Sequence, residues 1–171
     1  HIRGKDAITK ARRTVMNGGI IAIKGIGGFH LCCDARNENA VRQLREKKFR
    51  PVKPFAVMMR NMTAVRNSCI IEHINQEKIL DGHQKPILLL KKKSSSPLSD
   101  SVAPGNPKVG IMLPYAPIQM LLFDYPDGIE MTDALIMTSG NPSGAPICHT
   151  DEEARDALQG KICSLILSNN R

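Results

Sequence analysis

Short apolar runs of strand length alternate with amphipathic helical patterns along this chain, and this alternation is its strongest constraint on fold. The predicted strands lie at residues 20–23, 55–59, 87–90, 109–113, 134–137 and 164–167. Apolar residues at helical spacing lie between them, at residues 6–17, 37–47, 62–80, 116–123 and 150–158, where the stretch 62–80 fits one or two helices. Such an order predicts one α/β domain, built on a mixed sheet with helices on its faces.

Local signals predict several element boundaries. Gly18 ends the first helix, and the glycines of segment 25–28 predict a flexible loop. Asn37 is a helix N-cap by type and position. Thr150 and Glu153 have the spacing of a capping box, which predicts a helix that begins there.

Charge and cysteine content narrow the classes of protein. The formal net charge is +8 and the isoelectric point about 9.4, which favours an anionic partner such as nucleotide phosphate, RNA or an acidic protein surface. A simply soluble basic surface is the alternative. The five cysteines show no C-x-x-C spacing, which fits a reducing, cytoplasmic compartment.

No apolar run has the length that crosses a bilayer, so no membrane association is expected. The chain begins at His1 without an initiator methionine and ends just after an apolar stretch. We therefore expect residues 1–171 to be a single domain cut from a longer polypeptide.

A basic segment follows the second predicted helix, and its residues are Lys47, Lys48, Arg50 and Lys53, with prolines at 51 and 54. Prolines end a helix and hold the connection extended. Lysine supplies a compact charge and arginine a planar fork, so together they can grip several phosphate oxygens. The alternative is a solvated helix C-terminus, where basic residues are favoured by the helix dipole.

A second polar segment follows the strand at 134–137 and reads Thr138-Ser139-Gly140-Asn141-Pro142-Ser143-Gly144. Ligands of α/β proteins gather at the carboxyl ends of strands, and glycines let backbone N–H groups approach an anion closely. Such residues also build ordinary turns, and that alternative stays open.

A third segment, Lys24-Gly25-Ile26-Gly27-Gly28-Phe29-His30, follows the first predicted strand. It matches neither the dinucleotide-binding G-x-G-x-x-G pattern nor a Walker A loop. Lys24 and the glycine backbone could face a ligand, whereas a histidine such as His30 is more often a hydrogen-bonded structural residue than a catalyst. No nucleophilic triad is indicated, and spacing does not single out an aspartate for Mg²⁺.

These segments occur in one order that resembles the YrdC-like domain of HypF carbamoyltransferases. The resemblance rests on K-G-I-G-G-F-H-L at 24–31, K-F-R-P-V-K-P at 48–54, V-G-I-M-L-P-Y at 109–115 and T-S-G-N-P-S-G at 138–144. The K-x-R-P and S-G-N-x-S-G elements are shared with threonylcarbamoyl-adenylate synthases. Those synthases have a P-T-x-T-x-Y-G-L segment where this chain has residues 24–31.

The resemblance implies a twisted open sheet with a concave basic face, and it implies a reaction. Carbamate, made from carbamoyl phosphate by an acylphosphatase module, would be adenylated by ATP with Mg²⁺, and pyrophosphate would leave. A transferase module would then pass the carbamoyl group to HypE, toward the cyanide ligands of nickel–iron hydrogenase. The zinc-finger, acylphosphatase and transferase modules are absent from these residues, so the segment alone would not complete the transfer.

The resemblance also implies roles for individual residues. Lys48 and Arg50 would be the catalytic pair that binds the ATP phosphates. The nucleotide and carbamoyl pocket would be lined by the remaining motif residues, namely Lys24, Gly27, Gly28, His30, Lys53, Thr138, Ser139, Asn141 and Ser143. Two alternative functions remain at this point: a threonylcarbamoyl-adenylate synthase for tRNA modification, and a non-catalytic module that binds double-stranded RNA through its positive charge.

Overall fold

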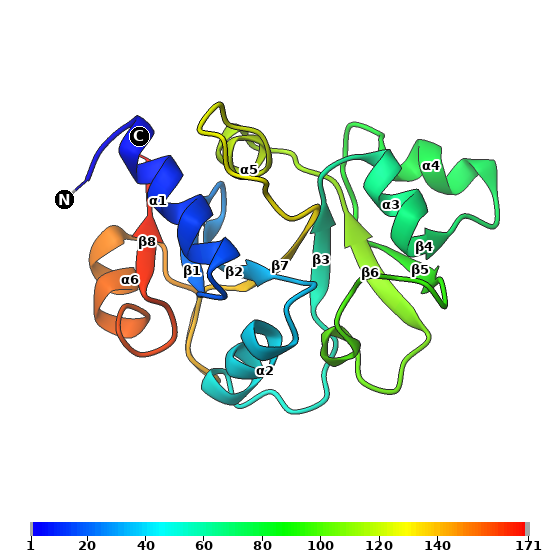
Figure 1. Cartoon of the computed structure of the whole chain (residues 1–171). Helices are drawn as coiled ribbons and strands as arrows, with labels where there is room; N and C mark the ends of the chain where they lie inside the picture. Colours follow the sequence, from blue (N-terminus) through cyan, green and yellow to red (C-terminus); the bar gives the residue numbers. More distant parts are fainter. Residues whose placement is uncertain (1, 170–171) are drawn as a thin grey trace.

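A computed structural model describes residues 2–169 as an open mixed sheet flanked by helices (Figure 1). The helices are α1 (Lys5–Met16), α2 (Glu38–Lys47), α3 (Met62–Ser68), α4 (Ile74–Leu80), α5 (Pro117–Phe123) and α6 (Asp151–Ala157), with a 3-10 turn η1 (Asp100–Val102). The strands are β1 (Ile21–Gly25), β2 (Gly28–Asp34), β3 (Ala56–Met59), β4 (Cys69–Ile70), β5 (Leu88–Lys92), β6 (Lys108–Met112), β7 (Ala134–Ser139) and β8 (Leu165–Leu167). The predicted α/β class and mixed sheet are confirmed.

The strand order is β4-β5-β6-β3-β7-β2-β1-β8, with parallel pairing only at β3–β6 and β1–β8 among the described strands. Strand β7 therefore lies in the middle and joins a β1–β2 half to a β3–β6 half, with antiparallel pairing on both sides. Because β7 comes late in the sequence, segments far apart in the chain meet at its two edges. The ends of β7 and β2 bring Ser139 opposite His30.

Each face of the sheet has its own hydrophobic core. Helices α2, α3, α4 and α6 pack on one face, and α1 and α5 pack on the other. Alternation along the strands assigns neighbouring residues to opposite cores, so Cys32 lies in one core and Cys33 in the other, as expected for adjacent residues of a strand. Both thiols are free and buried, and burial raises their pKa values.

The predicted helix caps are confirmed. The Asn37 side chain accepts a hydrogen bond from the Ala40 backbone N–H at 3.1 Å, which begins α2. Thr150 and Glu153 form a capping box at the start of α6, where the Thr150 hydroxyl oxygen accepts from the Glu153 N–H at 3.1 Å. These bonds satisfy N–H groups that have no partner inside the helix.

The end of α2 differs from its prediction, because the helix stops before the first proline. Phe49 adopts the left-handed conformation, with a φ of 49°. The Arg50 N–H then donates to the Arg45 carbonyl at 3.0 Å and the Phe49 N–H donates to the Glu46 carbonyl at 3.1 Å, which is a Schellman motif. Backbone bonding rather than proline ends this helix, although glycine is the residue usually found at the left-handed position.

The predicted flexible loop at 25–28 is also corrected. Gly25 pairs with Gly28, so β1 and β2 form a hairpin with the two-residue turn Ile26-Gly27. Strand β2, which the apolar pattern did not predict, follows directly. A glycine with a φ of 133° at position 28 makes this turn possible, because residues with a Cβ atom rarely adopt that conformation.

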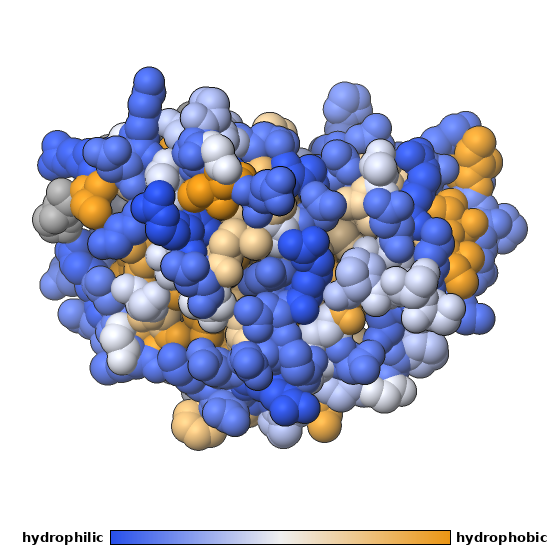
Figure 2. Space-filling view, viewed as in Figure 1, coloured by the Kyte–Doolittle hydropathy of each residue, from blue (hydrophilic) through white to orange (hydrophobic). Residues whose placement is uncertain are grey.

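Most of the surface in Figure 2 is hydrophilic, with hydrophobic side chains exposed at the edge formed by α4 and β5. There Ile74, Ile87 and Leu89 are 70%, 59% and 61% exposed. Among residues 2–169, no helix combines the length and the apolar character needed to cross a bilayer. The concave basic face stays a prediction.

Candidate nucleotide site

Lys48 is a buried cation at the point where α2, β7 and the loop after β7 meet. Its exposed fraction is only 5%. Its Nζ donates to the Ser139 carbonyl at 2.6 Å, the Asn141 Oδ1 at 3.1 Å and the Ser139 hydroxyl at 3.2 Å. Burial, and secondarily the charge of Arg50, lower the pKa of Lys48 to about 8. All these partners are uncharged, so they do not neutralise the ammonium group.

Asn141 fixes the loop that follows β7. Its Oδ1 also accepts from the Ser139 hydroxyl at 2.7 Å, and its side-chain amide donates to the Ala145 carbonyl. The structure thus brings together Lys48, Ser139 and Asn141, which the sequence analysis assigned to one site. The role of these residues in binding a ligand stays a prediction.

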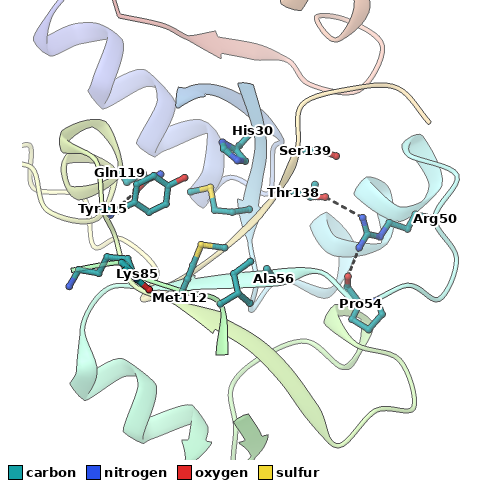
Figure 3. Close-up of a pocket in the computed structure, with 13 residues that line it drawn as sticks. His30, Arg50, Pro54, Ala56, Lys85, Met112, Tyr115, Gln119, Thr138 and Ser139 are labelled. Atoms are coloured by element: carbon teal, nitrogen blue, oxygen red, sulfur yellow. Dashed lines mark hydrogen bonds between the residues drawn. The ribbon is translucent and has the colours of Figure 1, made fainter. Parts of the chain in front are cut away.

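Arg50 lies on the loop between α2 and β3 and lines the neighbouring cavity. Its guanidinium donates to the backbone carbonyls of Lys53 and Pro54 and stacks over the Phe55 ring, with 4.9 Å between the guanidinium carbon and the ring centroid. One terminal nitrogen lies 3.5 Å from the Thr138 hydroxyl oxygen. Figure 3 shows the contacts of Arg50 with Pro54 and Thr138. Burial lowers the pKa of Arg50.

Arg45 shapes this loop, and sequence reasoning missed it. The buried guanidinium donates to the backbone carbonyls of Arg50 and Lys53 at 2.9 and 3.0 Å. It also donates to the carbonyls of Ser101 and Val102 in η1. Its guanidinium carbon lies 4.4 Å from the centroid of the Phe55 ring, on which it stacks. The available signal was its position four residues after Val41, on the apolar face of α2.

The three arginine and lysine side chains just described form a cationic cluster, which we define as Arg45, Lys48 and Arg50. Within residues 2–169, none of the three makes an ion pair with a carboxylate. Burial of a cation without a counter-charge costs free energy, and a bound anion would reduce that cost. The cluster therefore marks a candidate anion site.

A cavity of about 570 Å³ opens beside Arg50 (Figure 3). Its apolar part comes from the sheet and its polar part from strand ends and loops, and no carboxylate lines it in the part of the chain that is described. The lining residues are His30, Arg50, Pro54, Ala56, Gln84, Lys85, Ile87, Met112, Tyr115, Gln119, Met137, Thr138 and Ser139. A volume of this size suits a small-molecule ligand.

His30 enters the cavity from β2. The buried Nδ1 atom of its ring has no hydrogen-bond partner among the described residues. Burial lowers the pKa of His30. The alternative of a hydrogen-bonded structural histidine is therefore wrong for this nitrogen.

Lys24 is placed away from this cavity. Its Nζ donates to the Asp151 carboxylate at 3.2 Å and lies 5.8 Å from the centroid of the Phe29 ring. Phe29 belongs to the core opposite the one that faces His30, so Lys24 and His30 lie on different faces of the sheet. Three other predicted site residues, Gly27, Lys53 and Ser143, are exposed and do not line the cavity.

The segments at residues 24–30 and 138–144, both predicted to belong to the site, are nevertheless in direct contact. The Gly140 N–H donates to the Phe29 carbonyl at 2.8 Å, and the Phe29 N–H donates to the Cys148 carbonyl at 2.8 Å. A Cβ atom on Gly140 would lie 2.5 Å from the Phe29 oxygen, and one on Gly28 would lie 2.9 Å from the Cys148 oxygen. These glycines let the loop after β7 pack directly on the β1–β2 hairpin.

In residues 2–169, no group of three or more histidine, cysteine, aspartate or glutamate side chains could hold a metal ion. The ligands of the expected Mg²⁺ thus stay unassigned. An ion that accompanies a nucleotide is commonly held in large part by the phosphates themselves.

Comparison with known proteins gives consistent matches. A family model named for Sua5, YciO and YrdC, and described as "Telomere recombination", matches residues 13–171. The chain is 41% identical to a carbamoyltransferase HypF of Synechocystis over 90% of its length, and 40% identical to HypF2 of Cupriavidus necator over 95%. It spans only 19% and 21% of those two relatives.

Solved structures agree with this fold. A full-length HypF, crystallised in a phosphate- and nucleotide-bound form, superposes with a TM-score of 0.88 and 43% identity over 96% of this chain and 25% of that one. Sua5 of P. abyssi, in complex with L-threonine, superposes with a TM-score of 0.82 at 19% identity, over 99% of this chain and 49% of that one. The second likeness shows the shared fold alone.

Proposed function

The chain belongs to the Sua5/YciO/YrdC family, and from this membership we propose that it is the carbamate-adenylating domain of a HypF-type carbamoyltransferase. The observation that carries the proposal is the cationic cluster, whose Arg50 lines a cavity with no carboxylate among its described lining residues. ATP with Mg²⁺ would bind there, with Arg50 nearest the phosphates. Lys48 would act through its charge and by holding Ser139 and Asn141, because its donors already serve protein acceptors.

The chemistry requires no general base. A carbamate oxygen, already anionic, would attack the α-phosphorus of ATP, and the bond from that phosphorus to the pyrophosphate oxygen would break. Carbamoyl-AMP forms and pyrophosphate leaves with the bonding electrons. The main barrier is to bring two anions together, and fixed cations in a partly desolvated site lower it.

Sequence similarity favours carbamate over threonylcarbamate as the acyl substrate. Identity is 40–41% to the HypF proteins but 19% to the threonine-bound Sua5. The β1–β2 hairpin at residues 24–31, where the synthases carry another motif, contributes His30 to the cavity. The hairpin is therefore the natural place for a difference in acyl substrate.

The remaining steps would take place outside this chain, which spans about a fifth of the curated relatives it matches. An acylphosphatase module would release carbamate from carbamoyl phosphate. A transferase module, together with a zinc-finger module, would pass the carbamoyl group to HypE. Calorimetry on the isolated chain tests the nucleotide step without these partners.

We expect a non-hydrolysable ATP analogue, α,β-methylene-ATP, to bind the chain with Mg²⁺, as measured by titration calorimetry. Arg50→Met should weaken binding by roughly 10- to 100-fold, because charge-assisted contacts to phosphate contribute about 1.5–3 kcal/mol. Arg42→Met is the matched control, since Arg42 is an arginine of α2 with a side chain 68% exposed and paired with Glu38.

The control variant should bind within twofold of the wild type. Absence of binding by the folded wild-type chain would refute the proposed function, and equal loss in both variants would refute the site. Pyrophosphate release that depends on L-threonine and bicarbonate would instead assign the chain to the threonylcarbamoyl-adenylate synthases.

A further inference from the structure

We propose that His30 recognises the acyl group of the substrate, as a neutral imidazole that donates a hydrogen bond from Nε2 to the carbamate oxygen that does not attack phosphorus. This inference rests on the proposed function and assigns one side of the same cavity. The observation behind it is the buried Nδ1 of this ring, which has no hydrogen-bond partner among the described residues.

The position of His30 distinguishes it from Arg50, the member of the cationic cluster that lines the cavity. His30 is the register partner of Ser139, so its side chain lies one strand spacing from that of Ser139 on the same face of the sheet. Arg50 approaches the cavity from the opposite edge of β7, through the loop that leads into β3. Arg50 and His30 thus face the cavity from different elements, so a phosphate held by Arg50 would leave His30 free for a smaller polar group.

The surroundings of His30 select one tautomer. A neutral imidazole has one N–H donor and one bare acceptor nitrogen. A hydrogen on Nδ1 would be buried without an acceptor among the described residues, and a buried donor without an acceptor is destabilising. The hydrogen is therefore best carried by Nε2, which can reach the cavity that His30 lines.

The absence of a side chain at Gly25 leaves room for the His30 ring. A Cβ atom on residue 25 would lie 3.1 Å from Nδ1 and 3.2 Å from Cε1 of His30. The imidazole thus packs against the glycine of the facing strand, with Nδ1 turned toward the hairpin backbone. This packing keeps Nδ1 away from solvent and leaves Nε2 as the ring nitrogen that a ligand can reach.

A neutral donor suits carbamate chemistry. Protonated carbamate decomposes to carbon dioxide and ammonia, so an imidazolium beside the substrate would endanger it. The ionisable groups that share the cavity with His30 are Arg50, Lys85 and Tyr115, and no carboxylate among the lining residues would stabilise an imidazolium. Desolvation also disfavours the charged form. His30 can therefore bind an oxygen of the carbamate without delivering a proton to it.

Nitrogen-15 spectra of the histidine rings test the assignment directly. Ring nitrogens, read through the carbon-bound ring protons, distinguish the two neutral tautomers and the charged form, and His30→Gln identifies the His30 signals. At pH 7 we expect the Nε2–H tautomer. Addition of ammonium carbamate to the chain saturated with Mg²⁺ and α,β-methylene-ATP should shift the Nε2 signal, whereas ammonium chloride should not. An Nδ1–H tautomer, a charged ring or no shift would overturn the proposal.

Binding measurements on variants separate this inference from the proposed function. His30→Leu should leave affinity for α,β-methylene-ATP within twofold and weaken carbamate binding to the nucleotide complex at least tenfold. His30→Gln, whose amide can place a donor near the position of Nε2, should recover most of that loss. Equal weakening of nucleotide and carbamate would overturn the assignment of His30. Failure of the wild type to bind the nucleotide analogue would overturn the proposed function itself.

Discussion

At the scale of single residues, Lys48 is a cation held entirely by neutral oxygens. Its pKa of about 8 lies below the ordinary value of 10.5 because the charged form is desolvated. Between these two values the unfolded chain binds more protons than the folded one, so this residue makes the free energy of unfolding rise with pH over that window. Below about pH 8 the folded state carries the full cost of the buried charge.

The same titration should control anion binding. As pH rises from 7.5 to 9, Lys48 loses its proton, and affinity for Mg²⁺ and α,β-methylene-ATP should fall roughly tenfold, as calorimetry at several pH values can measure. Lys48→Arg stays charged throughout this range, so its affinity should be nearly constant with pH. A parallel decline in that variant would show that another group titrates.

Arg45 is a residue whose fork geometry, as well as its charge, is used. Arg45→Lys keeps a cation but cannot reach the carbonyls of Arg50, Lys53 and Val102 together. We expect urea denaturation to show a loss of about 2 kcal/mol in the free energy of unfolding. The exposed Arg42→Lys change should stay within about 0.5 kcal/mol, and an equally small effect at Arg45 would contradict its structural role.

At the scale of secondary-structure elements, the end of α2 carries backbone strain close to the site. A left-handed conformation costs a residue with a Cβ atom about 1–2 kcal/mol, and the Phe49 side chain is 82% exposed. Since it has little packing to offset that cost, the strain is held by the bonds that Arg45 and Glu46 accept from the residues after the helix.

Phe49→Gly should therefore raise the free energy of unfolding by about 0.5–1 kcal/mol, after allowance for the greater entropy that glycine has in the unfolded chain. Phe49→Ala removes the same ring but keeps the strain, so it serves as the control for side-chain loss. Urea denaturation of the three proteins gives the comparison. A glycine variant no more stable than the alanine variant would rule out strain at this position.

Sequence patterns predicted where the helices and strands lie better than they predicted which strands pair with one another. Apolar runs and caps such as Asn37 gave most strands and helix starts, because those signals are local. Strand β2 was missed since its residues include His30 and Asp34, and its pairing with β7 depends on contacts distant in sequence. For the same reason Lys24 was expected at the site, although the strand register places it on the other face of the sheet.

At the scale of the whole molecule, β7 makes one cooperative unit of the two halves of the sheet. Its residues pair with β2 on one side and β3 on the other, and Ile136 is fully buried. Neither core is complete without it. Lys48 and His30 both meet this strand at Ser139: the Lys48 ammonium donates to the Ser139 carbonyl, and His30 is the register partner of Ser139.

Ile136→Ala should lower the free energy of global opening by about 3 kcal/mol, within the usual range for a buried isoleucine. Native-state hydrogen exchange should show the same decrease for the most protected amides of β2 and of β6, because both depend on β7. A decrease confined to one half would show that the halves unfold independently.

The central place of β7 also has a consequence for folding during synthesis on the ribosome. The strands that flank it are synthesised long before it: β2 ends at Asp34 and β3 at Met59, whereas β7 begins only at Ala134. Until β7 emerges, β2 and β3 each present an open edge to which other chains could pair. Most of the nascent chain must therefore wait for residues 134–139, and that interval is when it most needs protection from aggregation.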